Sequence, residues 1–295
     1  MKSPGHPKNG RGGAVSDFAG SDAAGALAAA WPGPEVVEFV RGRMCETSEI
    51  GLVLGSGLGG IADELDDRCT LTSGEIPGYP SSTVSGHEGR LHLGEWGGRR
   101  IWCVQGRVHL YEGHTPEVTT RYVRLLHALG VRTLLLTNAA GSLTTSVQPG
   151  EIVLDRDAIS LFFQPLAQPA EPNLPWRRRG ALSDSALAQR ARETGLELGI
   201  PFHEGTLVGG LGPTYETAAE VRAWRRLGGT VASMSTVPEA IQARELGLRL
   251  LMFSLVTNLG TGLSVTPLSH AEVVEVADRA GAELARLLRG IVGRI

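Results

Sequence analysis

The chain has 295 residues and a formal net charge of −3, and 42% of its residues are hydrophobic. This balance, with no long block of Lys and Arg in the sequence, argues against nucleic-acid or anionic-membrane partners. The three cysteines form no CxxC pair, which excludes a disulfide framework and the usual cysteine zinc sites and favours a reducing, cytoplasmic location. The longest apolar stretches, such as residues 250–256, are too short to span a bilayer.

The N-terminal segment differs in character from the rest. Residues 1 to about 20 are rich in Gly, Ser, Asp, Pro and Lys and offer little apolar surface to bury. Residues 23–30 are mostly Ala and Gly, which is too weakly apolar for a signal peptide. The sequence therefore predicts a disordered tail over residues 1–20 and a folded domain over residues 21–295.

We predict that this tail is dispensable. A chain starting near Ser21 should keep both its activity and its thermal midpoint, because the removed segment buries little. The measurement compares the activity and the thermal unfolding of the two chains. Loss of either property in the short chain would show that the tail packs on the domain.

From Ile50 onward, short apolar strands alternate with helices. The predicted strands are Ile50–Leu54, Arg100–Gln105, Thr133–Asn138, Glu151–Leu154, Gly205–Val208, Val231–Met234 and Leu250–Val256. Each is a brief β-branched or aliphatic run. This alternation without a compositional break predicts one α/β domain around a largely parallel sheet.

Helix boundaries are marked by capping residues. Thr115 and Pro116 begin one helix, which Gly130 ends. Capping boxes are predicted at Thr217/Glu220, Thr236/Glu239 and Ser269/Glu272, and the last of these opens a C-terminal helix. Residues 164–180 are rich in Pro and Arg and indicate a long surface loop.

A glycine loop follows the first strand. It reads Gly55-Ser56-Gly57-Leu58-Gly59-Gly60, and glycines let the backbone approach an anion at the start of the next helix. A dinucleotide site would also need an acid at a strand end about 20 residues on, and Glu75 lies in a turn instead. An anion-binding loop with the Ser56 hydroxyl as an added donor is favoured.

Two further segments carry polar groups or bare backbone to the predicted sheet. If the strand continues from Trp102, then Arg107, His109 and Tyr111 project to one face. A guanidinium there suits phosphate oxygens, although a polar edge strand gives the same pattern. Small residues at 137–141 place backbone amides where open α/β sheets bind ligands, although a tight turn is also possible.

Eight motifs in register resemble the trimeric-type purine nucleoside phosphorylases. They are GSGLG (55–59), GHEGRL (86–91), QGRVHLYEG (105–113), TNAAG (137–141), GPTYET (212–217), MSTVPE (234–239), TNL (257–259) and PLSH (267–270). The likeness runs from about Glu35 to the C-terminus. It implies a single α/β domain with a central mixed β-sheet flanked by helices, a homotrimer, and phosphate-driven release of a purine without metal or cofactor.

The resemblance also implies residue roles. Phosphate would be bound by Ser56, His87, Arg107, His109, the Ala139 amide and Ser235. The pentose would contact Tyr111, Met234 and His270, and the base would contact Tyr215, Glu216 and Asn258. Catalytic roles would fall to His109, Glu216 and Asn258. Glu216 precedes a capped helix, which favours an ionised carboxylate, and Ser56 and Ser235 each border a helix start.

The chain departs from the family at several positions. The family shows His-x-Asn-Leu after Arg-Asp, where this chain has Ala158 and Ser160, and a Gly where it has Ser233. Phe162 or Phe163 could supply the aromatic that the family places across a subunit interface. These changes put substrate preference and trimer contacts in doubt but leave the reaction class intact.

Two alternatives to a 6-oxopurine phosphorylase remain. A 5′-methylthioadenosine phosphorylase would want an apolar 5′ pocket and an Asp, and His270 and Asn258 argue against it. A nucleoside-binding or dinucleotide-binding relative without turnover would bind its ligand but release no base.

Overall fold

The computed structural model describes residues 31–44, 46–82, 89–164, 166, 180–264 and 270–295, with backbone only for residues 270–275 and 277–279. The strands are β1 Ile50–Leu54, β2 Asp66–Thr72, β3 Arg90–Trp96, β4 Arg99–Gln105, β5 Thr133–Ser142, β6 Ile152–Ser160, β7 His203–Gly209, β8 Val231–Ser233 and β9 Arg249–Leu259. The α-helices are α2 Pro34–Met44, α3 Pro116–Thr119, α4 Arg121–Ala128, α5 Ser185–Leu198, α6 Ala218–Arg226, α7 Val237–Glu245 and α8 His270–Val292. Three 3-10 helices are η1 Gly59–Glu64, η2 Ser73–Glu75 and η3 Leu110–Glu112.

The strands form one mixed sheet in the order β2-β3-β4-β1-β5-β8-β7-β6-β9. Strand β9 also pairs with β5, so that β5, β8, β7, β6 and β9 close into a ring. Strand β5 pairs in parallel with both β1 and β9. The C-terminal ends of β1, β5 and β9 therefore lie at the same edge of the sheet. Ligands bind at this edge in α/β sheets.

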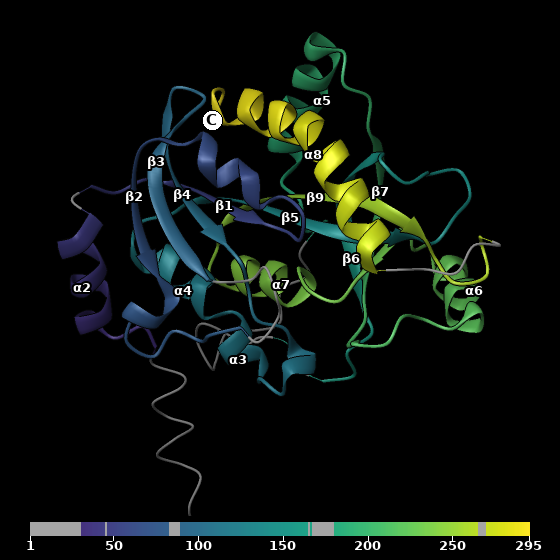
Figure 1. Cartoon of the computed structure of the whole chain (residues 1–295), viewed down its shortest axis with the longest axis horizontal. Helices are drawn as coiled ribbons and strands as arrows, with labels where there is room; N and C mark the ends of the chain where they lie inside the picture. Colours follow the sequence, from purple (N-terminus) through teal and green to yellow (C-terminus); the bar gives the residue numbers. More distant parts are fainter. Residues whose placement is uncertain (1–30, 45, 83–88, 165, 167–179, 265–269) are drawn as a thin grey trace, which may run out of the picture.

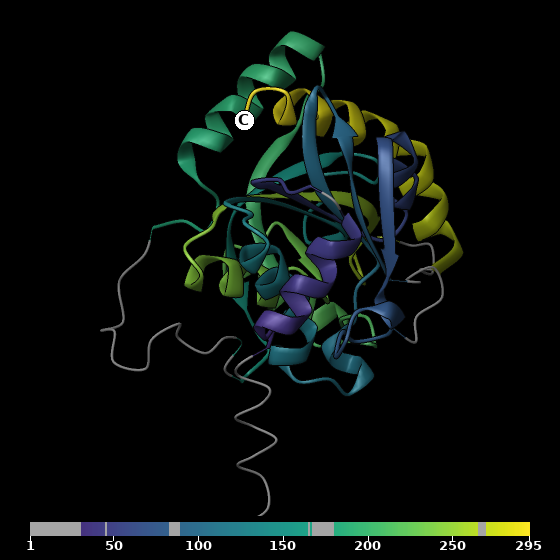
Figure 2. The same ribbon diagram turned by 90° about the vertical axis from the view of Figure 1, so that its left-hand side faces the viewer.

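Helices cover both faces of the sheet (Figure 1). Helices α5, α8 and η1 pack one buried cluster, which includes Leu187, Leu284 and Ile61. Helices α2, α4 and α7 pack a second cluster on the other side, with Val40, Leu126 and Ala243. Figure 2 shows α2 and α8 on different sides of the strands. The resulting layers are those of an α/β domain.

All seven predicted strands are present, and two strands were missed. Strand β2 pairs antiparallel with β3, and β3 pairs antiparallel with β4, so the sheet is mixed rather than largely parallel. Strand β2 lies at the edge of the sheet, and Leu71 is its only buried residue. This strand therefore lacks the apolar run by which the predicted strands were recognised. Pairing with β3 stabilises β2 as a strand, and a local sequence pattern does not reveal such pairing.

Two capping boxes can be compared with the sequence. At Thr217 the box is confirmed: the hydroxyl accepts from the Glu220 amide at 3.2 Å, and Glu220 accepts from the Thr217 amide at 2.7 Å. The box at Thr236 is wrong, because the Thr236 side chain makes no capping bond to α7 and the Glu239 carboxylate is bound to Arg107.

The other helix boundaries agree with the sequence where they are described. Thr115 and Pro116 begin α3, and Gly130 follows the end of α4 at a φ of 109°. The single helix predicted between them is wrong, because the chain is divided at Thr120 into α3 and α4. Ser269 of the third box, the predicted tail and most of the 164–180 loop lie outside the described residues.

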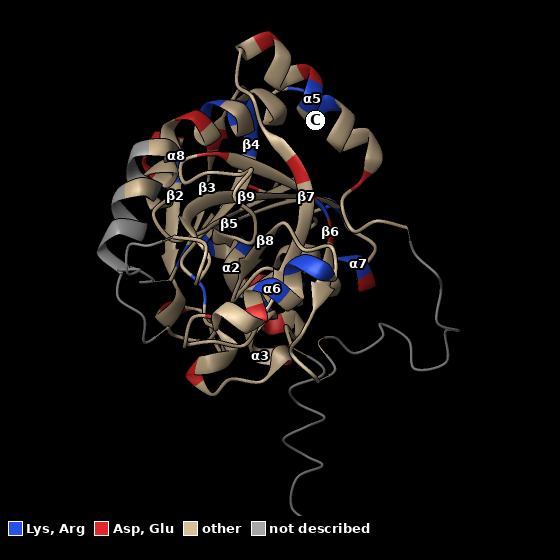
Figure 3. Ribbon diagram, turned by 90° about the vertical axis from the view of Figure 1, so that its right-hand side faces the viewer, with Lys and Arg blue, Asp and Glu red and all other residues tan. Residues whose placement is uncertain are grey.

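Charge is mixed over the described surface helices. Figure 3 shows acidic and basic residues interspersed along the ribbons of α5, α6 and α8. Neighbouring opposite charges keep the local potential small. Among the helices described, none is long and apolar enough to cross a membrane.

Candidate active site

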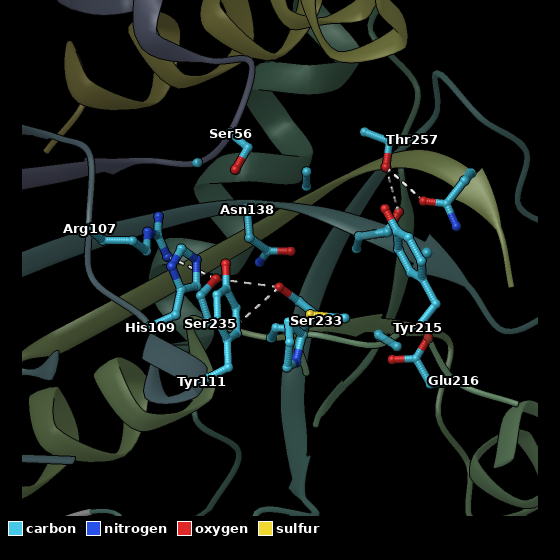
Figure 4. Close-up of a pocket in the computed structure, with 18 residues that line it drawn as sticks. Ser56, Arg107, His109, Tyr111, Asn138, Tyr215, Glu216, Ser233, Ser235 and Thr257 are labelled. Atoms are coloured by element: carbon cyan, nitrogen blue, oxygen red, sulfur yellow. Dashed lines mark hydrogen bonds between the residues drawn. The ribbon is translucent and has the colours of Figure 1, made fainter. Parts of the chain in front are cut away.

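A pocket of about 370 Å³ lies where several strands end. Its walls come from the segments after β1, β4 and β7, from β8 and the residues that follow it, and from the C-terminal parts of β5 and β9. A cavity of this size accommodates a small organic ligand. Figure 4 shows side chains from these segments facing one another across the pocket.

The pocket brings together ten of the residues predicted from the sequence. These are Ser56, Arg107, His109, Tyr111, Ala139, Tyr215, Glu216, Met234, Ser235 and Asn258. His87 and the side chain of His270 lie outside the described residues. The ten come from six separate segments of the chain, so the fold assembles them.

The glycine loop reaches the pocket because Gly55 packs directly on β5. A Cβ at Gly55 would lie 2.6 Å from the Asn138 Cα, so only glycine permits this approach. The helix after the loop is a 3-10 helix of six residues, η1, and its dipole is therefore smaller than the expected α-helix would supply. Glu75 accepts from the Thr72 amide at 2.8 Å and caps a turn, which removes it as a ribose ligand.

Arg107, His109 and Tyr111 reach the pocket differently from the prediction. Strand β4 ends at Gln105, Gly106 has a φ of 85°, and Tyr111 lies in η3. The expected continuation of the strand with period-two alternation is therefore wrong. The turn at Gly106 redirects the chain, and all three side chains still line the pocket.

The Arg107 guanidinium is held by a buried network. Its Nη1 lies 2.8 Å from Glu239 Oε2, and its Nη2 donates to the Thr137 carbonyl at 2.6 Å. Nη1 is also 3.2 Å from the hydroxyls of Ser235 and Thr236. The side chains of Arg107 and Glu239 are 1% and 3% exposed. Glu239 therefore positions Arg107, and removal of either partner would leave a buried charge uncompensated.

His109 is oriented from behind by a carboxylate. Its Nδ1 lies 3.1 Å from Glu112 Oε1, which also accepts from the His109 amide at 2.6 Å. An ionised Glu112 accepts hydrogen bonds, so the proton of the neutral imidazole is on Nδ1. The ring stacks on Tyr111 with centroids 4.7 Å apart. The carboxylate and the stacked ring together fix the imidazole at the pocket wall.

The end of β8 and the residues after it carry two serines into the pocket. Ser233 is 8% exposed, and its hydroxyl is 3.4 Å from that of Ser235. Ser235 directly precedes Thr236, the N-cap of α7, which places the Ser235 hydroxyl near the positive end of a helix dipole. The departure at Ser233 therefore adds a hydroxyl to the pocket wall.

The pKa of the Glu216 carboxyl group is shifted in the opposite direction from the one expected at a helix start. Burial raises the pKa of the Glu216 carboxyl, and the nearby negative charge of Glu220 raises it further. The position before α6 was expected to favour the ionised form, but desolvation outweighs the helix start. Tyr215 beside it is 43% exposed.

Asn258 is held by its neighbours at the end of β9. Its Oδ1 accepts from the Thr257 hydroxyl at 3.0 Å, and its Nδ2 donates to the Leu259 carbonyl at 3.2 Å. A Cβ at Gly141 would lie 3.0 Å from Nδ2. Glycine at this position therefore leaves room for the amide.

Some pocket residues were not singled out from the sequence. Asn138, Ser233 and Thr257 line the pocket, but no role of their own was predicted for them from the sequence. Asn138 and Thr257 were named only within longer motifs, and Ser233 only as a departure from the family. The signal that could have found Asn138 is its position at a strand end among small residues.

The remaining departures lie away from the pocket wall. Ala158 and Ser160 are in β6 and do not line the pocket. Phe162 is buried in this chain's own core, whereas Phe163 is 93% exposed.

The chain is similar to known proteins over most of its length. A family model described as the Phosphorylase superfamily matches residues 49–293. Purine nucleoside phosphorylase 1 of Bacillus subtilis is 40% identical over 259 residues, which cover 87% of this chain and 96% of that protein. Purine nucleoside phosphorylase of Bos taurus is 40% identical over 258 residues, covering 84% and 89% of the two chains.

Solved structures agree in fold. A structure of Schistosoma mansoni purine nucleoside phosphorylase in complex with inosine has a TM-score of 0.79 and 30% identity, covering 88% of this chain and 95% of that chain. A structure of the same protein in complex with adenosine also has a TM-score of 0.79 and 30% identity, covering 88% and 96%. The chain therefore belongs to the phosphorylase superfamily and, within it, to the purine nucleoside phosphorylases, which confirms the resemblance and the fold class and makes it an enzyme of that class.

Proposed function

We propose that the pocket binds inorganic phosphate and a purine nucleoside side by side and transfers the pentose between them. The observation that carries this proposal is one cavity lined by a buried arginine, three serine hydroxyls, a glutamate and two asparagine amides. Phosphate oxygen forms a bond to C1′ as the C1′–N9 bond breaks, and the purine leaves with the electron pair and takes a proton. The products are a pentose 1-phosphate and the free base.

The phosphate half consists of the cationic and hydroxyl-bearing residues. Arg107, Ser56, Ser235 and the Ala139 amide supply donors to the anion, and His109, with its proton on Nδ1, accepts at Nε2 from the P–OH of monohydrogen phosphate. Bound phosphate faces the oxocarbenium-like C1′ and stabilises its positive charge. His87, by its family motif, adds to this group.

The nucleoside half consists of the remaining residues. Tyr111 and Met234, with His270 by its motif, contact the pentose, and Tyr215 packs against the base. Glu216 accepts from N1–H, and Asn258 contacts O6 and N7. A 6-oxopurine such as hypoxanthine matches these groups, so inosine and guanosine are the proposed substrates.

The direct test is release of hypoxanthine from inosine with and without phosphate. A phosphorylase releases base only when phosphate is present and forms ribose 1-phosphate in equal amount. A binding relative without turnover would bind inosine and release nothing. A 5′-methylthioadenosine phosphorylase would prefer the 5′-methylthio substrate.

We also propose a homotrimer in which Phe163 contacts a neighbouring subunit. Its side chain is 93% exposed, which is unusual for a large aromatic on an isolated surface. Sedimentation of the wild-type chain and of Phe163→Ala measures the assembly. A wild-type monomer would contradict the proposal.

The raised pKa of Glu216 predicts a pH-dependent substrate preference. Below that pKa the carboxyl group is protonated and no longer suits the N1–H donor of inosine, whereas it can donate to the unprotonated N1 of adenosine. The ratio of kcat/KM for inosine to that for adenosine should therefore fall as pH decreases through the Glu216 pKa. The ratio cancels the titration of phosphate, which both reactions share. Glu216→Gln should remove the pH dependence of the ratio, and a wild-type ratio that is constant with pH would contradict this role.

A further inference from the structure

A buried carboxyl group lies behind the pocket and has no role in the mechanism above. Asp155 in β6 is 0% exposed. Its Oδ2 is 2.7 Å from the Ser254 hydroxyl, and the same hydroxyl is 3.0 Å from Asn138 Oδ1. Asn138 lines the pocket. The three side chains thus form a continuous path from the core to the ligand site.

Strand register creates this path. Ser254 in β9 lies opposite Asn138 of β5, and β9 also pairs with β6 at Val153 and Asp155. Strand β9 lies between the other two, so its serine reaches a neighbour on each side. The contact is built into the sheet and does not depend on a loop.

The number of protons shared by Asp155, Ser254 and Asn138 determines which side chain donates to which. The Ser254 hydroxyl has one proton, yet Asp155 Oδ2 and Asn138 Oδ1 would both accept it if Asp155 were ionised. Burial raises the pKa of Asp155 well above its usual value, and no opposite charge among the described residues offsets this. A protonated Asp155 donates to Ser254, and Ser254 then donates to Asn138 Oδ1.

The other end of the Asn138 amide faces the ligand. Its Nδ2 is buried and has no hydrogen-bond partner among the described residues. Figure 4 shows the Asn138 side chain projecting into the pocket on the side of Ser56 and Ser235. A buried donor without a partner is costly, and a phosphate oxygen at this place would satisfy it.

We propose that Asp155 is a positioning residue that acts through Ser254 to keep the Asn138 amide nitrogen facing the pocket, where it donates to bound phosphate. The reverse orientation would present the amide oxygen to the anion and repel it. The inference rests on the phosphate site proposed above, and neither Asp155 nor Ser254 touches the substrate.

The variants distinguish the effect of hydrogen-bond direction from the effect of side-chain packing. Asp155→Asn keeps the shape and a donor toward Ser254, so phosphate affinity should remain within about twofold of wild type. Asp155→Leu removes the donor and lets Ser254 accept from Asn138, which should weaken phosphate about two- to tenfold. Asn138→Ala should weaken it about tenfold or more. Ser183→Ala is the matched control, because Ser183 donates to the Asp155 carbonyl at 2.6 Å and is outside the path; it should lower stability without changing phosphate affinity.

The decisive measurement is a double-mutant cycle on the binding of inorganic phosphate, by titration calorimetry with the full chain. In the Asn138→Ala background, Asp155→Leu should cause no further loss, because its effect passes through Asn138. An equal loss in both backgrounds, or equal affinities for Asp155→Asn and Asp155→Leu, would overturn the proposal. If Asp155→Leu does not fold, Ser254→Ala takes its place in the same cycle.

Calorimetry separates this inference from the proposed function. Absence of inosine turnover with phosphate binding and the expected coupling intact would refute the reaction and leave the positioning role. Turnover with no coupling would refute the positioning role alone. Absence of phosphate binding in wild type would refute both.

Discussion

Arg107→Ala should both weaken phosphate binding and destabilise the fold. The substitution removes a cationic donor from the pocket, and loss of a hydrogen bond to a charged ligand costs about 1.5–3 kcal/mol, or roughly ten- to a hundredfold in affinity. It also leaves Glu239, 3% exposed, without its partner. Breaking a buried ion pair in this way costs about 3–5 kcal/mol of folding free energy.

Two further variants assign the two losses to their causes. Ser56→Ala removes a phosphate donor without touching Glu239, so phosphate KM should rise while the thermal midpoint stays near wild type. Adding Glu239→Gln to Arg107→Ala removes the buried charge, so stability should recover while phosphate affinity does not. The measurements are phosphate KM, nucleoside KM and the denaturation midpoint for each variant.

The outcomes that would contradict this assignment are specific. An unchanged phosphate KM in both Arg107→Ala and Ser56→Ala would remove the phosphate site from this part of the pocket. A stability loss that Glu239→Gln does not repair would show that Arg107 stabilises the fold by packing rather than by compensating Glu239.

Asn258→Asp should narrow the preference for 6-oxopurines over 6-aminopurines. In the transition state the amide nitrogen can donate to O6 of the base while the amide oxygen accepts from N7–H, and only interactions that are stronger in the transition state than in the ground state raise kcat. Adenosine presents a donor at position 6 and an unprotonated N1 to Glu216. Two mismatched polar interactions at about 1–3 kcal/mol each should make wild type strongly selective for inosine.

The variant changes the pattern of donors and acceptors. A carboxyl group can accept from the 6-amino group and, when protonated, can donate to N7. It would also face the Leu259 carbonyl, which now accepts from Asn258 Nδ2 at 3.2 Å, so activity toward inosine should fall. The gap between the two substrates should therefore shrink mainly from the inosine side.

Asn258→Ala is the matched control. It removes both hydrogen bonds to the base without adding a carboxyl group, so it should lower activity without favouring adenosine. The measurement is kcat/KM for inosine and adenosine in all three proteins. Equal cleavage of both substrates by wild type, or an unchanged ratio in Asn258→Asp, would show that Asn258 does not read position 6.

The local sequence contains enough to predict most of the site. Strand ends, glycine turns and helix caps are set by neighbouring residues, so the apolar runs before Gly55, Asn138 and Asn258 predicted strands that end at a ligand edge. The motif resemblance then identified the family and the residues that line the pocket.

Contacts between distant segments depended on the tertiary structure. Glu239 was predicted to form a capping box with Thr236, but the Thr236 side chain makes no capping bond, and the fold places Glu239 beside Arg107, 132 residues away in the chain. Both side chains of this ion pair are buried, which strengthens their attraction. The helix start was expected to favour the ionised form of Glu216, whereas burial raises the pKa of its carboxyl group. Asp155, Ser254 and Asn138 meet only because β9 lies between β5 and β6. Periodicity and capping report each residue's neighbours in the chain, whereas charge pairing, desolvation and strand register are set by residues that only the folded chain brings together.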